Sequence, residues 1–102
     1  DVATLVRVCL DHDDATVLAL LDRVREALAP GGLVVIAEPL AGVRGAEAVG
    51  DVYFAYYLSA MGRGRARRAD EFRALLERAG FRRVRVRPTR YPVVAGVVTG
   101  EV

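Results

Sequence analysis

The chain has 102 residues and a formal net charge of +2, with 53% hydrophobic and 27% charged residues. This length holds one small domain, and the composition is typical of a globular protein rather than of a disordered segment. No apolar run approaches the ~20 residues of a membrane-spanning helix, and the single cysteine, Cys9, cannot form an internal disulfide. One Cys and one His offer no zinc-binding spacing, so no metal is predicted.

The first part of the chain predicts a strand, a helix and a second strand. Ala3–Leu10 is largely apolar and β-rich, which predicts a strand. Asp13 or Asp14 then offers a helix N-cap. One apolar stripe at helical spacing follows, made of Val17, Leu20, Leu21, Val24 and Leu28. Pro30–Gly32 ends this helix, and Leu33–Ala37, apolar on both faces, predicts a strand covered on both sides in a parallel sheet.

The second part predicts two helices and two strands. Val49–Met61 is apolar on two faces, as expected for a helix that is sandwiched or covers a ligand, and Ala69–Ala79 is amphipathic. Arg82–Arg87 alternates arginine and valine, which predicts a strand with one wet face, and Val93–Val98 predicts a last strand that pairs with it as an antiparallel hairpin. The order β-α-β-α-α-β-β predicts an α/β fold, the C-terminal half of a doubly wound sheet, in one partial domain spanning residues 1–102.

Polar residues gather where the first two predicted strands end. The run Asp11–Asp14 follows the first strand, and Glu38 ends the second. Ligands of open α/β sheets bind outside the carboxyl ends of the strands, so a site is expected here, although Asp13 and Asp14 also serve as helix caps. Gly31 and Gly32 follow a helix rather than a strand and so do not form a dinucleotide-binding loop. Cys9, within an apolar strand, is interpreted as packing rather than as a nucleophile.

The ordered motifs of the chain resemble a known family. The stretch LVRVCLDHDDATVLALLDRVREALAPGGLVVIAEPLAG is similar to the fourth strand, following helix and fifth strand of S-adenosylmethionine-dependent small-molecule O-methyltransferases. The continuation GDVYFAYYLSAMGRGRARRADEFRALLERAGFRRVRVRPTR resembles the bacterial carotenoid branch, the hydroxyneurosporene or demethylspheroidene O-methyltransferases. The resemblance covers nearly the whole chain and implies a class I methyltransferase sheet, with S-adenosylmethionine as cofactor and a small-molecule hydroxyl acceptor.

The resemblance also implies roles for individual residues. His12 falls on the family's aromatic residue beside the adenine, and Arg7 is an accompanying cofactor-side residue. Glu38 falls on a carboxylate that orients the base or the acceptor hydroxyl. The implied acceptor pocket is lined by four apolar or aromatic side chains: Tyr53, Phe54, Tyr57 and Met61.

The chain departs from the family pattern at the catalytic base. Leu10 stands where the family has its general-base histidine, and Ala66 where it has a second carboxylate. We therefore expect methyl transfer by alignment of the acceptor, with His12 or Asp11 as proton acceptor. The family's glycine-rich cofactor loop and ribose-binding acid are also missing, so S-adenosylmethionine is expected to be bound mostly by a missing N-terminal half. The chain alone should then be inactive.

Two further classes of function remain open. Residues 1–62 carry a net charge of −5 and residues 63–102 a net charge of +7, with arginine as the sole basic residue type. No nucleic-acid motif accompanies this arginine-rich part, so a solvated face, or attraction to an anionic membrane surface, is favoured over nucleic-acid binding. An unpaired edge of Ala3–Leu10 would instead make the chain an assembly module, and a homodimer through that edge is predicted. Because the chain begins with Asp1 and shows no signal peptide, we expect a piece of a longer protein, in the cytoplasm or at its membrane face.

Overall fold

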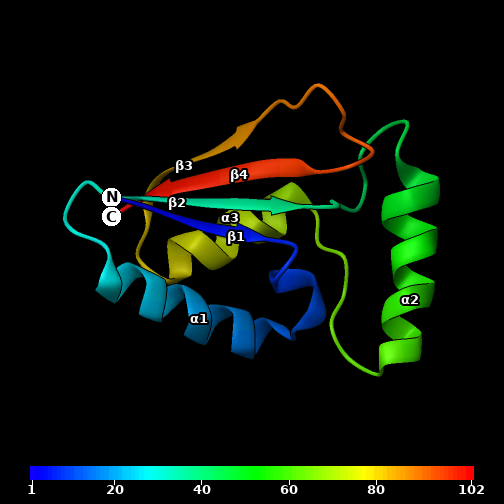
Figure 1. Ribbon diagram of the computed structural model, residues 1–102, viewed down its shortest axis with the longest axis horizontal. Coiled ribbons are helices and arrows are strands. Elements are labelled where there is room, and N and C mark those ends of the chain that lie inside the picture. Colours follow the sequence, from blue (N-terminus) through cyan, green and yellow to red (C-terminus); the bar gives the residue numbers. More distant parts are fainter.

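Four strands form one mixed sheet in the described backbone, residues 1–102; side chains are described for residues 1–48 and 51–102. In the computed structural model the strand order is β1-β2-β4-β3 (Figure 1). The strands are β1 (Val2–Val6), β2 (Leu33–Glu38), β3 (Arg82–Arg87) and β4 (Gly96–Glu101). The helices are α1 (Asp14–Ala27), α2 (Phe54–Met61) and α3 (Ala69–Arg78), with a 3-10 helix η1 (Cys9–Asp11) and a π-helix η2 (Ala48–Tyr53). The predicted order of elements and the α/β class are confirmed.

The sheet combines a parallel βαβ unit with an antiparallel hairpin. β1 pairs with β2 in parallel, and β4 lies antiparallel to both β2 and β3. The predicted hairpin is confirmed, but its second strand begins at Gly96 instead of Val93. Val93 and Val94 belong instead to the turn before β4, where the Val94 N–H donates to the Tyr91 carbonyl at 2.9 Å.

The first strand is shorter than predicted, ending at Val6 rather than Leu10. Arg7 adopts a positive φ of 54°, which takes the backbone out of the extended region. The next two N–H groups, of Val8 and Cys9, then donate to the Glu38 carboxylate instead of to a strand. The apolar run therefore continues as buried packing in η1, not as a strand.

Helices α1 and α3 both cover the same face of the sheet (Figure 1). The core between them contains Val17 and Leu21 of α1 and Phe72 and Leu76 of α3, packed against Val34, Ile36 and Val98 of the sheet. β2 alternates buried and partly buried residues, and Val2 and Val6 of β1 are 62% and 59% exposed. The strand β2 was expected to be covered on both faces; within the described chain, helices cover one face of the sheet only.

Helix α1 begins as predicted and ends by a different route. The Asp13 carboxylate caps it by accepting from the Thr16 N–H at 2.8 Å. At the other end the chain is already extended at Leu28, and the Ala29 N–H donates to the Asp1 carboxylate. Gly31, with φ of 79°, supplies the next turn rather than the helix C-cap.

Helix α2 stands apart from the sheet at the end opposite the two termini (Figure 1). It continues η2 and ends at Gly62, whose φ of 78° is the left-handed conformation of many helix C-caps. Val49, expected on one apolar face of this helix, lies outside the residues with described side chains. Among the helices described, none is long and apolar enough to span a membrane.

Candidate functional site

The candidate site lies where β1 and β2 end side by side. Parallel pairing aligns Val6 with Ala37, so the loop after β1 and the end of β2 meet at one edge of the sheet. Glu38 fixes this meeting point: its Oε1 accepts from the Val8 N–H at 2.9 Å and from the Cys9 N–H at 2.8 Å. The carboxylate therefore satisfies two backbone donors that the loop would otherwise leave unpaired.

Glu38 is fully buried, which sets its electrostatics. Desolvation raises the pKa of its carboxyl, against the opposing effect of the hydrogen bonds from Cys9 and Val8. Its other oxygen, Oε2, has no hydrogen-bond partner among the described residues. In this arrangement Glu38 positions the loop, and its carboxylate is not exposed to an acceptor.

Cys9 is buried beside Glu38 and is not a nucleophile in this setting. Burial, together with the neighbouring Glu38 carboxylate, raises the pKa of the thiol to about 12. A thiol with this pKa remains protonated at neutral pH and reacts poorly. The interpretation of Cys9 as packing agrees with this environment.

Arg67 makes a second connection to the same loop. Its side chain is completely buried and donates to the Cys9 carbonyl at 2.8 Å, the His12 carbonyl at 2.7 Å and the Asp14 carboxylate at 2.8 Å. Its guanidinium also lies 5.8 Å from the centre of the Phe72 ring. The segment before α3 is thereby bound to the loop after β1.

Neighbouring residues strengthen this connection. The Arg65 N–H donates to the Leu10 carbonyl at 3.0 Å, and the Arg65 guanidinium bridges Asp14 and Glu71. Desolvation raises the pKa of Asp14, but hydrogen bonds from Arg67 and Arg65 outweigh it, so the net shift is downward. Gly64, with φ of 83°, passes so close that an added Cβ would collide with the Leu10 carbonyl.

Sequence analysis did not find Arg67 or Gly64. Both lie in a Gly/Arg loop without periodicity, and Arg67 has the same residue type as its neighbour Arg68. Their partners in the loop after β1 and at the start of α1 are 53 to 58 positions away in the sequence. No local pattern reports a contact of that kind.

The residues expected on the cofactor side lie in this loop. Asp11 and His12 are partly buried, and the His12 backbone is held at both groups, its N–H by the Cys9 carbonyl and its carbonyl by Arg67. Arg7 is exposed, and its guanidinium lies 5.4 Å from the centre of the Phe54 ring. The loop thus contacts α2 through Arg7.

The residues expected on the acceptor side are divided. Phe54 is buried and packs with Leu10, Leu58 and Ala66 in a small apolar cluster separate from the main core. Tyr53, Tyr57 and Met61 are 61%, 42% and 56% exposed. The two tyrosine rings meet Phe54 edge to face at 5.3 Å and 6.4 Å. The structure therefore brings Leu10 and Ala66 together with one acceptor-side residue and leaves the other three as an open rim.

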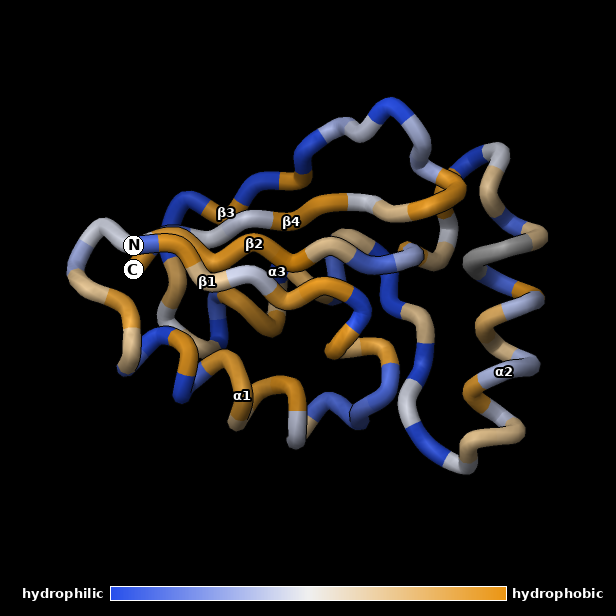
Figure 2. Tube along the Cα trace, viewed as in Figure 1, coloured by the Kyte–Doolittle hydropathy of each residue, from blue (hydrophilic) through white to orange (hydrophobic). Residues whose placement is uncertain are grey.

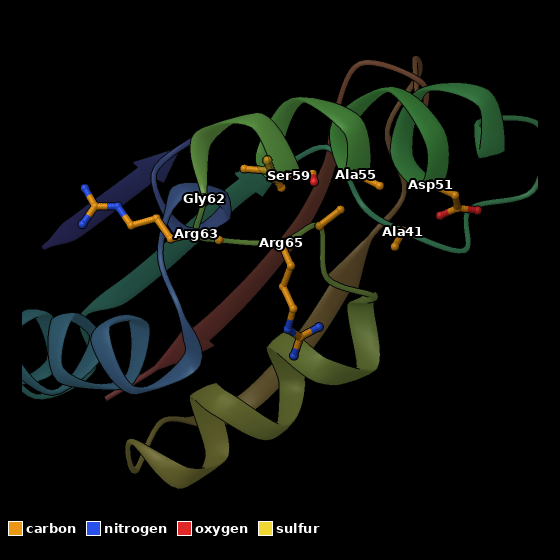
Figure 3. A pocket seen from close by; sticks show the side chains of 10 residues that line it. Ala41, Asp51, Ala55, Ser59, Gly62, Arg63 and Arg65 are labelled. Carbon is orange, nitrogen blue, oxygen red and sulfur yellow. The ribbon is translucent and has the colours of Figure 1, made fainter.

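A hollow lies on another side of α2 from these exposed side chains (Figure 3). It measures about 590 Å³ and is lined by Ala41, by Asp51, Ala55, Leu58 and Ser59 of the helical segment, and by residues 62–66. In Figure 3 Arg65 points from the loop toward α3, consistent with its ion pair to Glu71. None of the residues predicted for the site lines this hollow.

Comparison with known proteins identifies the class. A family model described as an O-methyltransferase domain matches residues 1–82, and the chain belongs to this family. Over 101 residues it is 45% identical to demethylspheroidene O-methyltransferase of Rhodobacter capsulatus, covering 99% of this chain and 26% of that protein. It is 41% identical over 92 residues to acetylserotonin O-methyltransferase of Mus musculus, covering 90% of this chain and 24% of the mouse protein.

Solved structures agree with this assignment. The methyltransferase CalO6 superposes with a TM-score of 0.82 at 32% identity, covering 98% of this chain and 34% of that one. Human N-acetylserotonin methyltransferase in complex with SAM superposes with a TM-score of 0.80 at 24% identity, covering 98% of this chain and 28% of the human one, and shows the shared fold. The chain spans about a quarter of the length of its curated relatives.

Proposed function

We propose that this chain forms the acceptor side of an enzyme that transfers a methyl group from S-adenosylmethionine to the hydroxyl of a small apolar acceptor, such as a hydroxycarotenoid. The relatives named for demethylspheroidene, 45% and 46% identical, support this acceptor class. One observation carries the proposal: Leu10 belongs both to the loop held by Arg67 and to the apolar cluster of α2. The cofactor side and the acceptor side of the expected site meet at this residue.

The described residues fit one wall of a cofactor site. His12 offers a flat ring that can stack on adenine, and hydrogen bonds at both backbone groups fix the backbone that carries this ring. Arg7 lies between this loop and α2 and is proposed as a cofactor-side cation. Contacts to the ribose and to the amino-acid part of S-adenosylmethionine are proposed to come from residues outside this chain, in line with the 26% coverage of the relatives.

The proposed role of these residues in methyl transfer is mainly alignment. Bound S-adenosylmethionine supplies the methyl group. Leu10 and Ala66 are apolar and cannot accept a proton. The Cys9 thiol stays protonated, and the buried Glu38 carboxylate is engaged in holding the loop. The acceptor hydroxyl is therefore proposed to lose its proton to His12, with Asp11 as the second candidate, while α2 holds the acceptor in line.

The acceptor is proposed to bind along the rim of α2. Tyr53, Tyr57 and Met61 present exposed apolar surface, and Phe54 anchors this rim to Leu10. Aromatic and thioether groups suit a long apolar molecule because they offer large contact area without requiring polar partners. The hydroxyl would then lie at the end nearest the loop of His12.

A chimera tests this proposal. This chain would replace the aligned C-terminal quarter of the Rhodobacter capsulatus relative, and methyl transfer to a hydroxylated carotenoid would be measured. We expect activity that falls at least tenfold in Tyr57→Ala and His12→Ala chimeras, whereas Arg23→Ala, on the exposed face of α1, serves as the matched control. A folded chimera that binds S-adenosylhomocysteine but transfers no methyl group would refute the acceptor-side role.

Calorimetry on the chain alone tests the division of the cofactor site. S-adenosylhomocysteine titrated into the purified chain is expected to bind weakly or not at all, with the oligomeric state recorded in the same sample. Tight binding by the isolated chain would contradict the proposal that most cofactor contacts lie elsewhere.

A second candidate function is assembly through β1. Within the described backbone β1 pairs only with β2, so its outer edge is free, and Val2 and Val6 beside it are exposed. We propose that isolated copies pair through this edge as a homodimer. A monodisperse monomer at high micromolar concentration, with fast amide exchange in β1, would exclude this mode.

A further inference from the structure

The strand β3 and the loop after it carry an unbalanced positive charge. Arginine occupies five of the nine positions from 82 to 90. Among the described residues, Arg83 pairs with Glu101 at 2.9 Å, whereas Arg82, Arg85, Arg87 and Arg90 have no carboxylate within ion-pair distance. Most of this charge is therefore available to an external anion.

The same loop holds apolar side chains out in solvent. Tyr91, Val93 and Val94 are 63%, 43% and 67% exposed. They are not a frayed segment, because a hydrogen-bonded turn fixes them: the Val94 N–H donates to the Tyr91 carbonyl at 2.9 Å, and the Thr89 hydroxyl donates to the Ala95 carbonyl at 2.8 Å. The guanidinium of Arg90 lies 5.5 Å from the centre of the Tyr91 ring.

The position of the loop in the fold suits a surface contact. The loop projects beyond the sheet at the end that also carries α2, away from both termini (Figure 1). Figure 2 shows hydrophilic and hydrophobic colours alternating along β3, hydrophilic colour in the loop after it, and hydrophobic colour returning just before β4. Cationic and apolar groups thus follow one another along one projecting edge.

We propose that β3 and the turn that follows it, residues 88–95, dock together on an anionic lipid bilayer. Arginines near an anionic membrane surface are attracted to lipid phosphates, tyrosine prefers the headgroup level, and the two valines gain by entering the acyl boundary. Duplex nucleic acid would also attract the arginines, but it offers no apolar layer for Val93 and Val94. The apolar tip therefore favours lipid. This inference concerns binding alone and stands apart from the methyl-transfer proposal.

Vesicle binding by the intact chain tests this inference. The chain has no tryptophan, so Tyr91→Trp introduces a single fluorescent reporter at the tip. On vesicles of phosphatidylcholine mixed with phosphatidylglycerol, we expect blue-shifted emission and co-sedimentation that weaken as salt is added. On phosphatidylcholine alone, binding should fall by at least tenfold.

A matched pair of double variants separates this surface from net charge. Arg87→Gln with Arg90→Gln should weaken the partition onto anionic vesicles by about 25-fold, at about fivefold per arginine. Arg73→Gln with Arg78→Gln removes the same charge from the exposed side of α3 and should change it far less. Val94→Asp should weaken binding without removing an arginine.

Three results would overturn the inference. These are absence of binding to anionic vesicles, equal losses in the two double variants, and an unshifted emission from Tyr91→Trp on vesicles that bind the chain. Tight, salt-sensitive binding to a DNA duplex without vesicle binding would assign the arginines to nucleic acid instead.

Discussion

Arg67 provides the sharpest test of how the site is held together. Arg67→Met keeps a long apolar side chain but removes one buried charge, the three short hydrogen bonds to Cys9, His12 and Asp14, and a longer one to the Arg65 carbonyl at 3.4 Å. The Asp14 carboxylate is 48% exposed and the His12 residue is partly exposed, so water can replace the lost donor at both. The Cys9 carbonyl is buried and would be left without that donor, in a site that also loses the packing of the guanidinium.

The expected loss of folding free energy depends on which of these acceptors water can reach. Hydrogen bonds to charged groups contribute about 1.5–3 kcal/mol each, but two of the three acceptors can be hydrated, so the full sum does not apply. Because Asp14 is 48% exposed, the substitution leaves no buried charge unpaired. The main loss is the donor of the buried Cys9 carbonyl, which costs about 1–3 kcal/mol. This is a large part of the roughly 5–15 kcal/mol that stabilises a typical domain.

Urea denaturation followed by circular dichroism measures the effect. With a slope of about 1–3 kcal/mol per molar urea, the midpoint of Arg67→Met should fall by roughly 1 M. Arg65→Met is the matched control: its side chain is 45% exposed and its ion pairs lie at the surface, so its cost should stay below about 1 kcal/mol. Arg67→Lys should be intermediate, because one ammonium cannot reach all three acceptors. Equal midpoints for Arg67→Met and Arg65→Met would refute the reasoning.

Three further predictions concern the same loop. The folded-state pKa of Glu38 is raised, so its contribution to stability is full below the ordinary pKa of 4.5 and is lost as pH rises through the folded-state pKa. The free energy of unfolding, measured at several pH values, should show this loss in the wild type and not in Glu38→Gln. Parallel pH profiles of the two proteins would contradict the prediction. Cys9, with a pKa of about 12, should resist iodoacetamide at pH 8 in the folded chain and react in urea, so rapid labelling of the folded chain would be contrary evidence. Gly64→Ala should cost more than about 2 kcal/mol because of its collision with the Leu10 carbonyl, whereas Gly62→Ala, with a similar positive φ but open space around it, should cost about 1 kcal/mol; equal thermal midpoints would show that the collision is relieved.

The elements that local patterns determine were predictable. The stripe of α1, the Asp13 cap and the position of the strand β2 depend on residues a few positions apart, and the structure has them as expected. Of the two errors in strand bounds, one arose from a distant partner and the other from a local turn. β1 stops at Val6 because Glu38, 29 to 30 positions away, takes the next backbone donors. The start of β4 shifted because a turn retains two valines whose β propensity alone favours a strand.

The candidate site divides in the same way. Its location at the strand ends follows from fold rules, and the loop of Asp11 and His12 lies there. Its internal organisation depends on long-range contacts. Arginine is mostly found on the solvated surface, so the residue type alone did not predict that the Arg67 side chain would be buried among carbonyls. The acceptor-side set is divided because α2 stands apart from the sheet (Figure 1), so that only Phe54 of this set is covered, by Leu10 and Ala66.

Three residues from two parts of the chain, β2 and the segment before α3, hold the loop after β1. Glu38 of β2 holds the N–H groups of Val8 and Cys9, Arg67 holds two carbonyls, and the Arg65 N–H holds the Leu10 carbonyl. Among the residues with described side chains, helix α2 has no comparable set of polar contacts and packs through the small cluster around Phe54. The expected cofactor side is thus fixed by hydrogen bonds, whereas the acceptor side is fixed by apolar packing that tolerates substitution. Under the proposed function, we therefore expect substitutions in α2 to change the acceptor without disturbing the loop that carries His12.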